Sequence, residues 1–275
     1  MTTVNLTTSM SSCLSALKTI ESTMESTNQK LATGLKVNSA LDDPLSYFAS
    51  EDHLDQADTL SLLNDDMNEA IQTINAADKG IEAIKDLLDD AKALCNSALS
   101  SDDDTEIDGY RKQLNDILAD IDEIAEDSGY AGVNLLSSDN LEVVFNEEGD
   151  SAITLTGVNG KAAGLCSNLA TQSTTWTSNT ATDTSINSVI DQIADAKSTL
   201  RENSKTLSSQ LSVITTRQEF TEGMIDVLET GSANLINADL NEESANLLAL
   251  QTQQSLATNS LSISSKSMQS VLNLF

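Results

Sequence analysis

Few residues in this sequence are of the types that usually carry out chemistry. The chain has one histidine, His53, and three widely spaced cysteines, Cys13, Cys95 and Cys166. Three scattered cysteines match neither a disulfide framework nor a CxxC metal site. Zinc sites and cysteine–histidine dyads need several such side chains close together. The sequence therefore predicts no metal and no cofactor, with Cys13 and Cys95 as small buried apolar residues and His53 as a solvated surface residue.

The run DDDTEID at residues 102–108 is a dense group of carboxylates. It lacks the glycine in the middle of an EF-hand loop, so it could hold a cation only loosely. Acidic residues also suit the first turn of a helix, which is the interpretation we favour. The chain has no GxxxxGK[ST], GxGxxG or GxSxG motif, the signatures of phosphate-binding loops, dinucleotide sites and hydrolase nucleophiles. We find no candidate catalytic residues and expect that the protein is not an enzyme.

The charge is large and unevenly distributed along the chain. The 43 acidic and 14 basic residues give a net charge of −29, which argues against nucleic acid as a partner. Residues 1–40 hold three lysines and two glutamates, a net charge of +1, and residues 233–275 hold one lysine and three acids, a net charge of −2. Residues 41–232 therefore carry −28. This contrast is what a solvated middle and buried, assembled ends would produce.

Both ends of the chain carry apolar residues in steps of four and three, the pattern of a coiled coil. We call these two sets the terminal seams. The N-terminal seam comprises Leu6, Met10, Cys13, Leu17, Ile20, Met24 and Leu31, with Thr27 as its weak member. The C-terminal seam comprises Leu247, Leu250, Ala257, Leu261, Met268, Val271 and Phe275, together with Gln254 and Ser264. Each seam needs a partner to cover it, so we predict that the seams mediate self-assembly.

Helical periodicity also dominates the middle of the chain. The same spacing predicts a helix over about 45–100, with Pro44 in its first turn behind Asp42 or Asp43, and another over about 107–124. A further helix is expected from about 185 to a break at Gly231. Between them, LEVVFN and SAITLTG read as a β-hairpin, and the Ser/Thr-rich stretch 171–185, which holds Trp176, reads as an exposed loop.

These elements predict a mainly α fold, an elongated helical hairpin or coiled coil with a small β-hairpin in the middle of the chain. We expect residues 1–43 and 233–275 to form a terminal coiled-coil domain. Residues 44–136 and 185–232 should form a long-helix bundle, with 137–184 as an outward hairpin and loop. No run of 18 apolar residues predicts a membrane span. The N-terminus lacks the charged and apolar regions of a cleaved signal peptide.

Three segments resemble the bacterial flagellins. QKLATGLKVNSALDD at 29–43 resembles the family's N-terminal signature, and SGYAGVNLL at 128–136 resembles its short motif after the long-domain helices. Residues 235–275 resemble the family's C-terminal segment over their whole length, and the similarity covers about 1–136 and 185–275. The three motifs occur in the family's order.

The resemblance implies a structural subunit that is exported without a cleaved signal peptide and polymerises into the extracellular flagellar filament, which transmits motor torque for swimming. Its terminal segments would pair as a coiled coil lining an inner tube. Its partners would be further copies of itself, other flagellins, the filament cap and hook-junction proteins, and the export chaperone and apparatus. Nucleic acid and membrane are not expected partners.

The chain departs from the family at the surface that an animal innate receptor recognises. Asp90 stands where many members carry an arginine, with Lys92 and Leu94 nearby, and Gln113 stands where a recognised acidic residue is expected. We therefore expect weak recognition by that receptor.

Two further functions and one modification stay open at this point. A hook–filament junction protein would share the family's ends, and a secreted coiled-coil adhesin could also use terminal seams. The Ser/Thr-rich residues 171–188 could carry O-linked sugars or could be a plain polar loop.

Overall fold

The computed structural model describes residues 8–165 and 175–272, and it divides into two compact units. The terminal unit joins Met1–Ala57 to Asp226–Phe275, and the central unit is Asp58–Ile225. Both divisions fall inside long helices. The elements are α1 (Thr8–Thr33), α2 (Pro44–Leu99), α3 (Asp104–Asp127), β1 (Leu141–Val144), β2 (Ala152–Leu155), α4 (Ala162–Leu165), α5 (Thr180–Ile236) and α6 (Leu240–Leu272).

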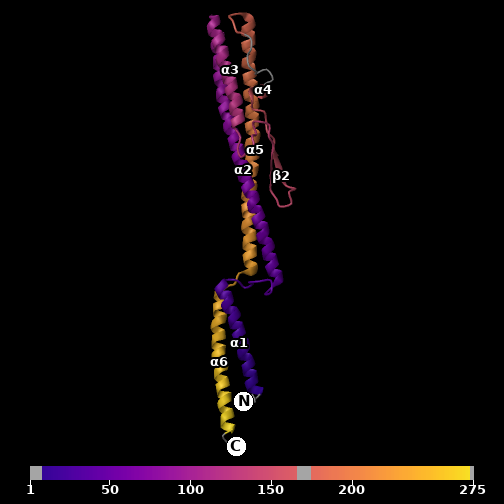
Figure 1. Ribbon diagram of the computed structural model, residues 1–275, viewed down its shortest axis with the longest axis vertical. Coiled ribbons are helices and arrows are strands. Elements are labelled where there is room, and N and C mark those ends of the chain that lie inside the picture. The colour runs from indigo at the N-terminus through magenta and orange to yellow at the C-terminus, as the bar shows by residue number, and fades with distance from the viewer. Residues whose placement is uncertain (1–7, 166–174, 273–275) are drawn as a thin grey trace. The chain divides into compact units, whose positions relative to one another are not determined.

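The central unit is built around α2, α3 and the antiparallel α5 (Figure 1). Its core comes from the apolar stripes of the three helices, including Ile81, Leu88, Leu114, Ile121 and Ile193, all fully buried. Polar pairs at the edge of the core join α2 to α5. Gln218 Nε2 donates to Asn68 Oδ1 at 2.8 Å and Ser204 Oγ donates to Asp78 Oδ1 at 2.9 Å. The predicted fold class, helical with one small hairpin, is confirmed.

The predicted hairpin is also confirmed. β1 and β2 pair antiparallel, with Leu141 opposite Leu155 and Val144 opposite Ala152. Val143 and Leu155 point into the core, and Phe145 is buried beneath the Arg217 guanidinium, whose carbon lies 5.4 Å from the ring centroid. Burial of these side chains fixes the hairpin on the helices, since two isolated strands are marginal in water.

The SGYAGVNLL segment ends α3 and covers α2. Asn134 Nδ2 donates to the carbonyl oxygens of Ala125 and Glu126, both at 2.8 Å, which satisfies acceptors left free at the helix end. Gly80 allows the segment to approach α2, because a Cβ at this position would lie 2.1 Å from Ser128 Oγ. The motif is therefore a helix cap that needs a glycine on the facing helix.

The terminal unit pairs α1 with α6 as antiparallel neighbours (Figure 1). The two helices meet at paired breaks in the chain. Lys36 N donates to Ile236 O at 2.7 Å and Ala238 N donates to Gly34 O at 2.9 Å, with Gly34 at a φ of 75°. The left-handed φ suits glycine. Beyond the break, Asp43 Oδ1 accepts from Leu45 N at 3.1 Å and caps α2 ahead of Pro44.

Two expectations from the sequence are wrong. Gly231 does not end α5, which continues to Ile236, because a single glycine costs a helix only about 1 kcal/mol. Next to Gly231, α5 packs closely on α2: the hydroxyls of Ser232 and Ser50 lie 2.8 Å apart and are buried. Small side chains are suited to such close packing. Trp176 has a buried side chain, although its neighbours Thr175, Ser178 and Asn179 are exposed. It is 3% exposed and precedes the start of α5 at Thr180, since an indole ring gains much from burial. Residues 171–174 lie outside the described part of the chain.

Candidate assembly surface

The two terminal seams face each other across α1 and α6 in a regular register. Cys13 Sγ lies 3.9 Å from Ser260 Oγ, and Lys30 Nζ lies 3.3 Å from Glu243 Oε1. The separation from 13 to 30 along α1 equals that from 243 to 260 along α6. The pairing therefore keeps one register along this stretch, as a heptad repeat on both helices allows.

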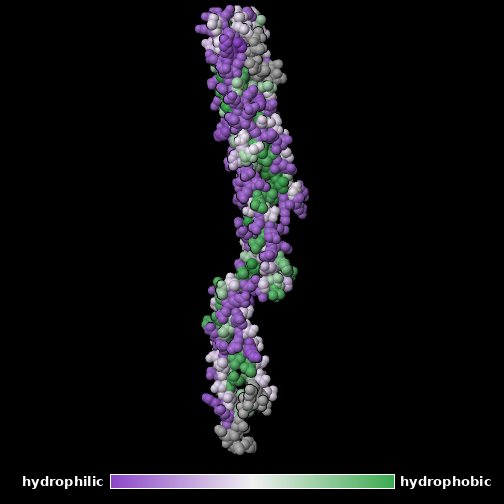
Figure 2. Space-filling model, viewed as in Figure 1, coloured by the Kyte–Doolittle hydropathy of each residue, from purple (hydrophilic) through white to green (hydrophobic). Residues whose placement is uncertain are grey.

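Seam residues are the least exposed positions of both helices. On α1, Leu17 and Thr27 are buried and the other described seam members are half-buried: Met10, Cys13, Ile20, Met24 and Leu31. On α6 the half-buried members are Leu247, Leu250, Gln254, Ala257, Leu261, Ser264 and Met268. The side chains of Leu6, Val271 and Phe275 lie outside the described residues. Apolar surface stays visible between the two helices (Figure 2).

The face of α6 turned away from α1 carries a second apolar row that the sequence reading missed. Leu248, Leu256 and Ile263 are 66%, 64% and 69% exposed. Leu256 and Ile263 are spaced by seven residues, so a search for a second heptad series would have found them. A helix with apolar residues on two faces is suited to burial by more than one neighbour.

A third exposed apolar group lies at the start of α2. Leu41, Leu45 and Phe48 are 95%, 82% and 58% exposed, and the Phe48 ring makes an edge-on contact with Tyr47 at 5.7 Å between centroids. Apolar groups left exposed side by side mark surfaces that bind other molecules.

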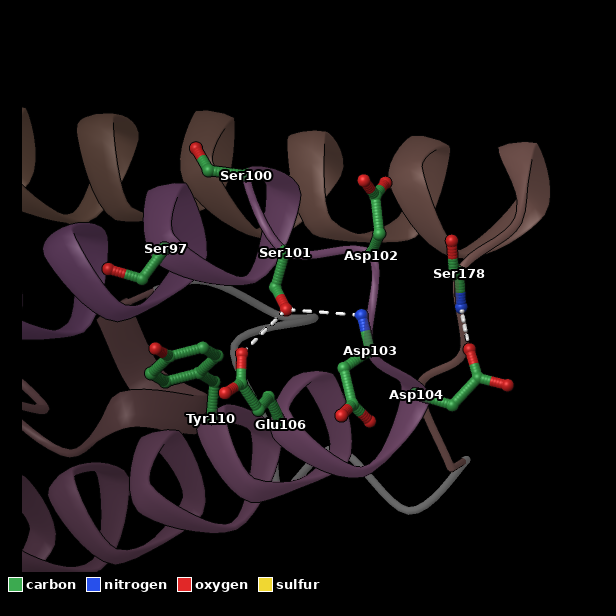
Figure 3. Close-up of a pocket in the computed structure, with 9 residues that line it drawn as sticks. All are labelled: Ser97, Ser100, Ser101, Asp102, Asp103, Asp104, Glu106, Tyr110 and Ser178. Atoms are coloured by element: carbon green, nitrogen blue, oxygen red, sulfur yellow. Dashed lines mark hydrogen bonds between the residues drawn. The ribbon is translucent and has the colours of Figure 1, made fainter.

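The acidic run at 102–108 includes the N-cap of α3 (Figure 3). Asp103 Oδ1 accepts from Thr105 N at 2.8 Å as the N-cap of α3, and Asp104 Oδ1 accepts from Ser178 N at 2.6 Å. Ser101 Oγ donates to Glu106 Oε2 at 2.9 Å. Within residues 8–165 and 175–272, no group of three or more potential ligands is placed to hold a metal ion. The carboxylates are used to begin a helix and to tie it to the segment before α5.

The residues expected at the innate-receptor surface are only partly gathered together. Asp90, Leu94 and Gln113 line one shallow groove between α2 and α3, with Asp90 and Gln113 exposed. Lys92 is exposed but lies on the other flank of α2, beside Asp89 and Lys197. The groove thus presents the carboxylates of Asp90 and Asp116 and the amide of Gln113.

The remaining candidate residues for chemistry differ in their surroundings. Cys95 is buried in the core of the central unit, and burial raises the pKa of its thiol to about 11. Cys13 is half-buried in the seam, and His53 is half-buried with its ring beside Gly231. Cys166 lies outside the described residues. In the part of the chain that the structure describes, no helix is long and apolar enough to cross a membrane.

The chain is similar to known proteins over most of its length. A family model described as the bacterial flagellin N-terminal helical region matches residues 4–140. A flagellin of Brucella melitensis biotype 1 is 30% identical, over 96% of this chain and 97% of its own length. The chain belongs to the flagellin family. Flagellin FljO of Caulobacter vibrioides is 27% identical over 95% of this flagellin and 94% of the relative.

Among solved structures, a crystal structure of Bacillus cereus flagellin aligns with a TM-score of 0.46 and 18% identity, covering 56% of this chain and 86% of that one. Family membership makes the protein a structural subunit of the flagellar filament, extracellular and with a role in motility. The family is structural rather than enzymatic.

Proposed function

We propose that this flagellin polymerises through its terminal seams, which become fully buried only in the filament. The observation that carries the proposal is incomplete burial: among the described apolar seam residues, Leu17 alone is buried in the single chain. Full burial of a leucine or methionine side chain contributes about 1.5–3 kcal/mol, and covering the half that is still exposed contributes part of this amount. The outward row Leu248, Leu256 and Ile263 supplies further area for a neighbouring copy.

We also propose how the chain is arranged in the filament. Segments 1–43 and 233–275, with net charges of −1 and −2, would line the inner tube. The helices of 44–136 and 185–232 would form the shell around it, and 137–184 would face outward. The charge distribution supports this order, because the segments assigned to the interior carry almost no net charge. Export without a cleaved signal peptide, and contacts with the chaperone, export apparatus, cap and hook-junction proteins, belong to the same proposal.

The test is assembly of purified protein, followed by electron microscopy and sedimentation. Leu261→Asp places a charge in the seam and should abolish filaments while leaving the helical content and melting of the central unit unchanged. Ser265→Asp adds the same charge at an exposed polar position of α6 one turn away and serves as the matched control. Normal filaments from Leu261→Asp would refute the proposal that the seam mediates assembly. Absence of filaments from the unmodified chain would refute the proposal that the protein polymerises.

We further propose weak recognition by the innate receptor for flagellin, because Asp90 and Gln113 replace the arginine and the acid expected there. A reporter-cell assay with monomeric protein tests this. Asp90→Arg with Gln113→Glu should raise potency, and full potency of the unmodified chain would overturn the proposal.

A further inference from the structure

The central unit is strongly acidic, yet it carries one concentrated group of cations. Residues 58–225 hold 31 acidic and 10 basic side chains, a net charge of −21. Three of the basic residues, Lys92, Lys197 and Arg201, lie around Asp89 where α2 packs on α5. Lys85 precedes Lys92 by seven residues, or two turns, and so lies on the same face of α2. We call these four residues the basic stripe. A Lys197 hydrogen bond lowers the pKa of Asp89, and Lys92 and Arg201 lower it further through their charge. The pKa of the neighbouring Glu82 is lowered mainly by its hydrogen bond from Lys79, and the charge of Lys85 lowers it further.

A groove of opposite character lies between α2 and the β-hairpin. It has a volume of about 450 Å³ and is lined in part by the apolar residues Leu63, Ala70 and Val143. Four exposed carboxylates also line it: Asp66, Glu69, Glu142 and Glu147. We call it the acidic groove. In Figure 2 apolar surface shows in the middle of this unit among hydrophilic residues.

The basic stripe and the acidic groove lie on opposite flanks of α2. Asp66 and Glu69 each precede a buried residue of the α2 core stripe, Met67 and Ala70. Lys85 and Lys92 each follow one, Ile84 and Ala91. Because one residue turns a helix by about 100°, the preceding and following positions point to opposite sides of the buried stripe. Along the helix axis the two patches are about 30 Å apart, at about 1.5 Å per residue.

We propose that the basic stripe of one flagellin copy docks against the acidic groove of a second copy. The proposal rests on polymerisation as proposed above and adds the surfaces through which the central units meet. Two copies that each carry −21 repel unless unlike patches are aligned, so charge complementarity selects this pairing. The aliphatic stems of Lys85 and Lys92 can cover the apolar part of the groove while their ammonium groups reach the carboxylates.

The geometry of the two patches also determines the kind of assembly. Since the two surfaces are different, the contact is heterologous, and a heterologous contact gives an open fibre only when successive copies do not close into a ring. The offset between the two patches displaces successive copies along the axis, which favours the open fibre. Their offset along α2 means that neighbouring central units are staggered by about 30 Å along the helix axis.

Zero-length carbodiimide cross-linking of assembled filaments tests the contact directly, because this reagent joins an amine to a carboxylate only when the two are in contact. Filaments grown from a mixture of isotopically light and heavy chains distinguish cross-links between copies from those within one copy. We expect light–heavy peptide pairs that join Lys85 or Lys92 to Asp66, Glu69, Glu142 or Glu147. Filaments whose cross-links between copies avoid these residues would overturn the inference while leaving polymerisation intact.

Charge reversal provides the second arm. Lys85→Glu with Lys92→Glu, and separately Glu142→Lys with Glu147→Lys, should each raise the critical concentration for assembly by about tenfold or more, since like charges then face each other. All four changes in one chain should restore assembly, because unlike patches meet again. Asp120→Lys with Glu123→Lys, exposed on α3 outside both patches, is matched in charge to the groove variant and should assemble normally.

Circular dichroism and thermal melting of each variant show whether it still folds. Failure of the four-fold variant to recover assembly, in a chain that melts like the original, would count against the pairing. Loss of assembly in the α3 control would show that net charge, not the patch, is responsible and would equally overturn the inference. Failure of the unmodified chain to polymerise would instead refute the proposed function.

Discussion

Lys30 Nζ lies 3.3 Å from Glu243 Oε1, joining the last turn of α1 to the first turn of α6. The Glu243 side chain is 14% exposed and that of Lys30 is 32% exposed. The pair lies about one turn from the chain breaks at residues 34–36 and 236–238. It stabilises the pairing of α1 with α6 at the end nearest to these breaks.

We expect Glu243→Gln to loosen the terminal unit by about 0.5–1 kcal/mol, the range for a partly exposed ion pair. Hydrogen exchange of amides in α1 and α6 would measure the change. A double-mutant cycle with Lys30→Met isolates the pair, and a coupling energy of zero would contradict it.

Removal of residues 235–275 should abolish polymerisation and leave the central unit folded. The buried core of that unit runs from Met67 to Ile214 and contains nothing from the removed segment. Sedimentation and the melting temperature of the central unit provide the two measurements. Filaments from the truncated chain, or collapse of the central unit, would contradict the assignment of the seam.

Assembly should become faster as ionic strength rises from low to moderate values. The net charge of −29 opposes association, and salt shortens the range of this repulsion to about 10 Å at 0.1 M. Light scattering at several NaCl concentrations would measure the assembly rate. An assembly rate that does not change with salt would show that repulsion between copies is not limiting.

Much of the fold could be predicted from the sequence because it depends on local periodicity. The α2 helix, the hairpin and both seams follow from residues spaced by three, four or two positions. The predictions for Trp176 and Gly231 were wrong because both depend on surroundings that lie elsewhere in the chain. The core of the helix bundle buries the Trp176 indole. The turns of α5 on either side of Gly231 stay helical, so the helix continues through the glycine. The basic stripe joins α2 to α5, more than one hundred residues apart, so no local pattern reveals it.

The Cys95 thiol should be unreactive in the folded protein. Burial removes it from solvent and raises its pKa to about 11, so little thiolate forms at neutral pH. In a Cys13→Ser, Cys166→Ser variant, modification by a disulfide reagent should therefore wait for unfolding. Rapid labelling under native conditions would show that the α2 core opens more readily than its packing suggests.

The Asp108 carboxyl should titrate far below an ordinary aspartate. Hydrogen bonds from Arg111 and Lys112 lower its pKa from 3.8 to about 2. Because the folded-state pKa is depressed, its stabilising contribution is complete above about pH 4 and is lost as the pH falls toward about 2. Carbon-detected NMR would give the midpoint. Asp108→Asn should melt at a lower temperature than the original chain at pH 6, and the two should converge near pH 2.

The contacts between α1 and α6 also determine when this protein can finish folding. Cys13 and Ser260 are 247 residues apart in sequence, so the pairing must wait until nearly the entire polypeptide is present. The Asn64–Glu222 contact, at 3.4 Å, joins residues only 158 apart, so it needs less of the chain. Once such central contacts form, the loop that the termini must close is shorter. A chain that lacks its last residues therefore has no completed terminal unit, and the surface proposed for self-assembly is the last part of the protein that can form.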